Sequence, residues 1–158
     1  MYVFMIICYF LMAINYINLL LCGSMGYFRF SIFSANHPQF ALFTILIFIT
    51  TETLVMYFFI ATGKSIKLLL KDHDSGKQLW KKIKLIKKDV FPHIMITILL
   101  IGGLFIHGGA VDNRLPIAWL HGPLFIVAIL HHSWSLIIKN RSFRKQIEIV
   151  STMSEDIE

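Results

Sequence analysis

The sequence predicts an all-α, polytopic integral membrane protein with four transmembrane helices. Of its 158 residues, 56% are hydrophobic and only 15% are charged, and the mean hydropathy is +0.69. Soluble domains carry about 25% charged residues. Four continuous apolar stretches are long enough to cross a hydrocarbon core of roughly 30 Å, and none alternates as the strands of a membrane barrel do. With only two cysteines, a secreted disulfide scaffold is also excluded.

The predicted spans cover residues 1–21, 40–62, 91–108 and 117–138 of a single domain, 1–158. Each is close to the roughly 20 residues that a spanning helix needs. The first span is expected to be retained, because a signal peptide begins with basic residues and residues 1–4 contain none. Leu21 is also too large for the position before a lipoprotein cysteine at Cys22.

Basic residues predict the orientation. Nine of the fifteen Lys and Arg lie between Lys64 and Lys88. Four more follow the last span, namely Lys139, Arg141, Arg144 and Lys145. Only Arg29 and Arg114 lie in the other two connections, so the positive-inside rule predicts that both termini, the loop 64–90 and the tail 139–158 are cytoplasmic. The expected location is the bacterial inner membrane, with anionic lipid headgroups rather than nucleic acid as the partner of the positive charge.

Within the basic loop, apolar residues recur at helical spacing, at Leu79, Ile83, Ile86 and Val90. Five lysines surround this stripe, at Lys81, Lys82, Lys84, Lys87 and Lys88. The pattern predicts a short amphipathic helix at the membrane surface, after a turn at residues 72–76 and before Pro92 directs the chain into the third span. A helix that binds a partner protein is the alternative.

Four histidines predict two layers across the third and fourth spans. His93 and His107 are fourteen residues apart and return to within about 40° of one face, and His121 and His132 are eleven apart, within about 20°. Because the two spans are antiparallel, His107 and His121 should meet near the outer surface and His93 and His132 near the inner one. His131 is rotated by about 80° from the face of His121.

This arrangement resembles di-haem b-type membrane cytochromes, in which imidazoles from two helices bind an iron on each side of the bilayer. The fourteen-residue spacing matches, and glycines that would let a porphyrin approach occur at Gly102, Gly103, Gly108 and Gly122. The resemblance implies haem b bound by the four histidines. Two alternatives stay open: local hydrogen bonding at the membrane surface, or a non-haem metal held by His107, His121 and Asp112.

Glu52 lies near the middle of the second span, within a Thr-rich cluster at residues 50–53. A carboxyl group at this depth should be protonated or paired with a donor from another helix, and Asn15 and Asn18 of the first span are at comparable depth. Its role would be a proton relay, a quinone contact or an interhelical hydrogen bond. If the group is neutral, Glu52→Gln should be tolerated.

Residues 56–67, 90–92 and 115–116, with His121, resemble a small group of uncharacterised bacterial four-helix inner-membrane proteins. That resemblance implies the topology and supplies no activity. The expected function is a non-catalytic membrane subunit of a larger complex, which includes respiratory and redox assemblies, with other membrane subunits as partners. The alternative is a haem-b electron-transfer subunit. A transporter or channel is less expected, because the four spans show no internal repeat.

Overall fold

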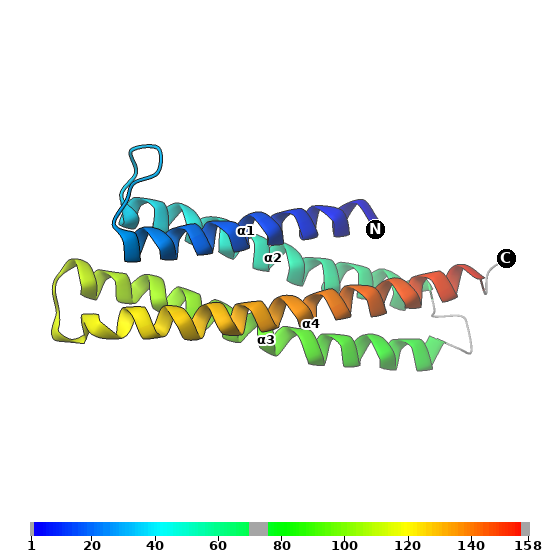
Figure 1. Cartoon of the computed structure of the whole chain (residues 1–158). Coiled ribbons are helices and arrows are strands. Elements are labelled where there is room, and N and C mark those ends of the chain that lie inside the picture. Colours follow the sequence, from blue (N-terminus) through cyan, green and yellow to red (C-terminus); the bar gives the residue numbers. More distant parts are fainter. Residues whose placement is uncertain (1, 70–75, 156–158) are drawn as a thin grey trace.

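The structure, a computed structural model, describes residues 2–69 and 76–155, and this part of the chain is helical apart from short connections (Figure 1). Its elements are α1 (Tyr2–Phe28), α2 (His37–Leu69), α3 (Gly76–Asp112), the short 3-10 helix η2 (Pro116–Leu120) and α4 (His121–Glu155). The four α-helices are long and apolar enough to cross a membrane. The predicted all-α class with four candidate spans is therefore confirmed.

The helices form two antiparallel hairpins, α1–α2 and α3–α4, that lie one against the other (Figure 1). Residues 29–36 join the first hairpin, and residues 113–115 with η2 join the second, at what we call the hairpin end. α1 begins and α4 ends at the opposite terminal end. Arg29 directly follows α1, and Arg114 lies two residues after the end of α3. Their φ angles are 54° and 52°, a left-handed conformation that commonly ends helices.

Three of the four helices are much longer than the predicted spans. α2, α3 and α4 contain 33, 37 and 35 residues, which corresponds to about 50–55 Å at 1.5 Å per residue. α1 is shorter, and its Phe4 packs on Tyr57 and Phe58 of α2 (ring centroids 6.0 and 5.7 Å apart). Beyond this level, residues 64–69, 76–90 and 144–155 continue as helices; we call them the three-helix extension (Figure 1).

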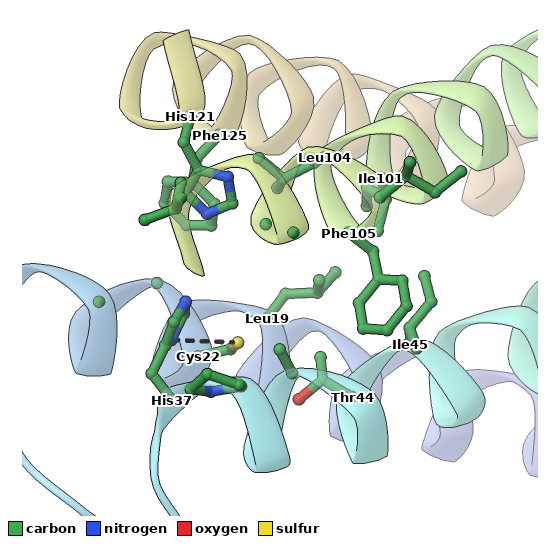
Figure 2. Close-up of a pocket in the computed structure, with 18 of the residues that line it drawn as sticks. Leu19, Cys22, His37, Thr44, Ile45, Ile101, Leu104, Phe105, His121 and Phe125 are labelled. Carbon is green, nitrogen blue, oxygen red and sulfur yellow. Dashed lines mark hydrogen bonds between the residues drawn. The ribbon is translucent and has the colours of Figure 1, made fainter. Parts of the chain in front are cut away.

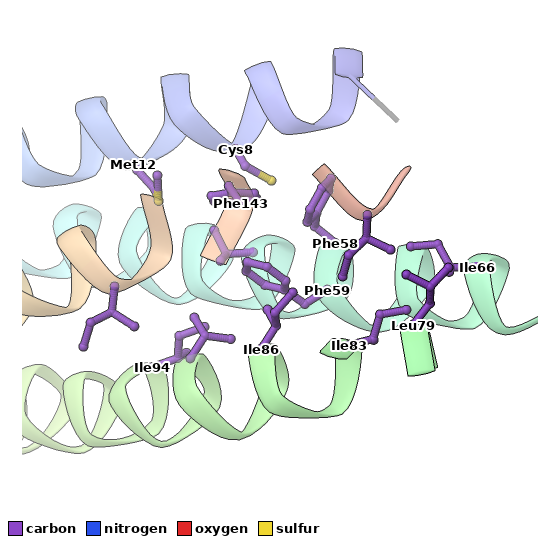
Figure 3. Packing of buried hydrophobic residues seen from close by; sticks show 14 residues of the cluster. Cys8, Met12, Phe58, Phe59, Ile66, Leu79, Ile83, Ile86, Ile94 and Phe143 are labelled. Atoms are coloured by element: carbon purple, nitrogen blue, oxygen red, sulfur yellow. The ribbon is translucent and has the colours of Figure 1, made fainter. Parts of the chain in front are cut away.

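The structure does not support a separate helix at the membrane surface. α3 runs without interruption from Gly76 to Asp112, with Pro92 inside it. The apolar stripe at Leu79, Ile83, Ile86 and Val90 is at most 7% exposed. It packs in a cluster with Ile66 of α2 and with Phe143 and Ile149 of α4 (Figure 3). The stripe thus faces a protein core, which a single sequence cannot distinguish from a lipid surface. Residues 70–75, which include most of the predicted turn, lie outside the described residues.

The bundle contains two buried apolar clusters. The larger one, nearer the terminal end, includes Cys8, Val55, Phe58, Ile94 and Ile138 (Figure 3). The second, nearer the hairpin end, consists of Leu19, Ile45, Phe48, Ile101, Leu104 and Ala128. On every helix, the residues between these two clusters include a buried polar side chain.

Candidate functional site

A polar layer separates the two apolar clusters. Each helix contributes to it at the same level, and its members are all 0% exposed: Asn15, Thr51, Glu52, Thr97, His132 and Ser135. Ionisable groups inside a membrane bundle are costly and usually have a function, so this layer is the first candidate site.

Glu52 pairs with a lysine in the layer. The Lys139 Nζ donates a hydrogen bond of 2.5 Å to Glu52 Oε1, and both side chains are 0% exposed. His132 Nδ1 lies 4.0 Å from the same oxygen. Lys139 was predicted to begin the tail, and Asn15 and Asn18 were the predicted donors to Glu52; in the structure the donor is Lys139. His132 and Lys139 are seven residues apart on one face of α4, which is the spacing that could have revealed the cluster.

His132 turns toward α1 and α2. Its ring stacks on Tyr16 at 5.9 Å and meets the edge of Phe48 at 5.8 Å. Neither ring nitrogen has a hydrogen-bond partner among the described residues, and the same holds for Glu52 Oε2 and both side-chain polar atoms of Asn15. Buried polar atoms in proteins are nearly always satisfied by protein or ordered water, so these atoms are positions where water or another polar group can bind.

The inner histidine pair differs from the predicted one. His93 stacks on His131, with ring centroids 5.7 Å apart, and not on His132. Thr97 donates to the His93 carbonyl oxygen at 2.7 Å, so its hydroxyl oxygen accepts from His131 Nδ1 at 3.1 Å. Adjacent residues on a helix point about 100° apart, and the residue facing α3 is His131.

At the hairpin end the structure brings together three histidines. His107 of α3 stacks on His121 of α4, with ring centroids 5.9 Å apart, and His37 of α2 meets His121 edge-on at 6.3 Å. Cys22 Sγ lies 3.9 Å from His37 Nδ1. Both nitrogens of His107 and Nδ1 of His121 are buried without a partner among the described residues. His37 is not among the predicted histidines, because its proximity to His121 depends on how the two hairpins pack.

A pocket of about 550 Å³ opens between the two hairpins beside this cluster (Figure 2). His37 and His121 line it among apolar side chains, and so do five glycines: Gly23, Gly26, Gly108, Gly109 and Gly122. Its size is within the range of pockets that bind small molecules and cofactors. Two glycines that the sequence placed beside a porphyrin, Gly102 and Gly103, are not among the residues that line this pocket.

The non-haem metal set of His107, His121 and Asp112 does not form in this structure. Within residues 2–69 and 76–155, no three His, Cys, Asp or Glu side chains form a group that could hold a metal ion. Asp112 is exposed.

The predicted membrane-surface lysines lie on the outside of the three-helix extension. Four of them are exposed, at Lys81, Lys82, Lys84 and Lys88, and Lys87 is half-buried. The amines of Lys67, Lys84 and Lys87 lie 5.1, 5.6 and 6.0 Å from the centre of the Trp80 ring, so cation–π contacts hold part of this basic surface in place.

Comparisons of the chain with protein-family models, curated proteins and solved structures each found no match. Its function is therefore inferred from its own residues.

Proposed function

We propose that the protein is a non-catalytic, multi-pass subunit of a larger complex in the bacterial inner membrane. The observation that supports this is the three-helix extension, because it is a rigid, apolar-cored and strongly basic projection beyond the length of a membrane span. A projection of this kind is better suited to binding a partner subunit than to catalysing a reaction.

The orientation follows from the charge on this extension. Nine of its described side chains are basic: Lys64, Lys67, Lys81, Lys82, Lys84, Lys87, Lys88, Arg144 and Lys145. At the hairpin end only Arg29 and Arg114 are basic. The positive-inside rule then favours a cytoplasmic extension and cytoplasmic termini. Fifteen helical residues, 76–90 of α3, reach about 22 Å past the membrane-spanning part.

The docking partner would present acidic groups. Each basic residue near an anionic membrane surface contributes roughly 1 kcal/mol, and an acidic subunit face offers the same complementarity. In the spans, many large apolar side chains point outward, such as Phe10 (66% exposed), Leu99 (70%) and Ile106 (79%). These side chains would face lipid or a neighbouring membrane subunit.

Gentle-detergent purification of the tagged chain from its own membranes tests the proposal. We expect stoichiometric partner subunits to co-purify, and we expect replacement of Lys81, Lys82, Lys84 and Lys88 by Gln to release them. The matched variant with Arg at the same four positions keeps the charge and should retain them. A wild-type protein that purifies alone at low ionic strength, where charge pairing is strongest, would contradict the proposal.

A haem-b electron-transfer subunit is the second candidate. It is favoured by the cluster of His37, His107 and His121 at the hairpin end, which we call the outer cluster. Two imidazoles that share one metal ion have ring centres about 6 Å apart, from metal–nitrogen distances of ~2.0 Å plus ~1.1 Å from each nitrogen to its ring centre. The centroid distances from His121 to His107 and to His37 are 5.9 and 6.3 Å. The unpaired nitrogens and the adjacent glycine-lined pocket fit such a group, which would supply one-electron chemistry when bound.

A reduced-minus-oxidised spectrum of the purified protein tests this candidate. A b-type α-band that is lost in His121→Ala and retained in His131→Ala would assign the outer cluster as the binding site. A colourless protein from haem-supplemented cells would refute the haem candidate and leave the docking proposal standing.

A further inference from the structure

One face of α4 carries a continuous row of buried polar residues, which we call the polar seam. Its members are His132, Ser135, Lys139, Ser142 and Gln146, and each is 0% exposed. Their spacings of three and four residues keep them on one stripe of the helix. The stripe is about 21 Å long, from fourteen residues at 1.5 Å each.

α2 supplies polar partners along the seam, but too few to satisfy it. Gln146 Nε2 donates to Thr62 Oγ1, and Lys139 donates to Glu52. Six further side-chain atoms of the seam and of its partner Glu52 are buried with no hydrogen-bond partner among the described residues. They are His132 Nδ1 and Nε2, Ser135 Oγ, Ser142 Oγ, Gln146 Oε1 and Glu52 Oε2.

Such a concentration of unpaired atoms is unusual, since native proteins leave few buried polar groups unsatisfied. Buried waters typically make about three hydrogen bonds each to groups of this kind. A row of waters along the seam would satisfy hydroxyl, amide, imidazole and carboxylate groups together, because water both donates and accepts.

The two ends of the seam differ. Gln146 lies within the three-helix extension, where neighbouring Arg144 and Lys145 are exposed. Beyond His132, the second apolar cluster, with Phe48 and Ala128, closes the bundle toward the hairpin end. The seam therefore leads from the extension into the membrane-spanning part and stops at His132.

We infer that the polar seam is a hydrated, one-sided proton path that connects the aqueous phase around the three-helix extension with the cluster of His132, Glu52 and Lys139. A proton from that phase adds to a basic atom of the cluster and returns by the same route, so the exchange needs no other reactant. Among the described residues, the titratable side chain of Tyr16 on α1 stacks on His132, and that of the neighbouring His131 points to His93 of α3.

Cysteine accessibility tests the water in the seam. In a Cys8→Ala, Cys22→Ala background, Ser135→Cys and Ser142→Cys place near-isosteric thiols in the seam. Ile137→Cys, at a position 52% exposed on the outer surface of the same helix, is the matched control. Charged methanethiosulfonates react with thiolates in water and not in lipid, so both seam cysteines should react at least about tenfold faster than the control. Equal, slow reaction of all three in folded protein would show a dry seam and overturn the inference.

Sidedness is tested in sealed vesicles of each orientation. The seam cysteines should react when the reagent is on the side of the extension and not when it is on the side of the hairpin end. Reaction from the hairpin end would contradict a one-sided path.

Proton exchange is tested by the ring N–H signal of ¹⁵N-labelled His132 after transfer of proteoliposomes to D₂O. Ser142→Leu should slow exchange at least about tenfold by excluding water from the seam, whereas Ile137→Leu on the outer surface should leave it unchanged. An exchange rate that is the same in both variants would overturn the inference even if both proteins are fully folded.

Discussion

Replacing Glu52 by Gln should strongly destabilise the bundle, whereas the sequence predicts that this change is tolerated if the carboxyl group is neutral. The difference is Lys139, whose amine contacts Glu52 Oε1 at 2.5 Å while both side chains are 0% exposed. An amide has no charge to offset the buried ammonium group. The variant must therefore either keep the ammonium group inside the bundle without its counter-charge or neutralise it.

Both routes give a cost of several kcal/mol. A lysine at the centre of a spanning helix costs about 2.5–3.5 kcal/mol on insertion scales. Removing the proton from a lysine in water at pH 7 costs about 5 kcal/mol, given its reference pKa. This value is the upper limit of the expected loss of stability. We therefore expect Glu52→Gln to lower the free energy of unfolding by about 3 kcal/mol, a change of more than a hundredfold in the equilibrium constant.

Unfolding of the purified protein in mixed micelles with increasing sodium dodecyl sulfate measures this change. The double variant Glu52→Leu, Lys139→Met should recover most of the loss, because replacing a buried ion pair by apolar residues is often neutral or stabilising. Thr53→Val, at the exposed neighbouring position, is the control and should remain within about 0.5 kcal/mol of wild type. A Glu52→Gln variant as stable as that control would refute the buried ion pair.

Two further pairs of variants test the packing. Gly23→Ala should destabilise by about 1 kcal/mol, because its Cβ would collide with the Phe125 ring and overpacking exceeds the gain in helix propensity, whereas Gly103→Ala faces open space and should be neutral or stabilising in the same assay. Ile83→Ala, at a 0% exposed position of the extension, should cost about 2–4 kcal/mol, against less than about 1 kcal/mol for Leu85→Ala, which is 57% exposed; equal small losses would favour a helix at the lipid surface instead.

The class of fold was predictable because hydrophobic length is a local property. Each span could be found from about 20 neighbouring residues without knowledge of its partners. The lengths of α2, α3 and α4 were not predictable. The stripe at Leu79 and Ile83 of α3, for example, has the same periodicity whether it faces lipid or protein. Only its contacts with Ile66 and Phe143 decide between these environments.

The sequence predicted which residues belong to the candidate site better than it predicted which of them contact one another. Glu52 and the histidines were identified because ionisable residues are rare in spans. Their partners depend on helix rotation, which a single sequence does not fix. A rotation of 100° separates His131 from His132, and it decides which of them meets His93. Lys139 was misassigned because a lysine just after an apolar run normally ends a span.

Because α3 is one continuous helix, a bend at one point along it would move both of its ends. Pro92 lies 16 residues from Gly76 and 20 from Asp112, so the two arms are about 24 and 30 Å long. The proline removes one backbone hydrogen bond of the rod and makes this the point where it bends most easily. A tilt of 10° in the long arm would displace its far end by ~5 Å. That end carries the α3 wall of the pocket between the two hairpins, so a bend of α3 at Pro92 would change the width of this pocket.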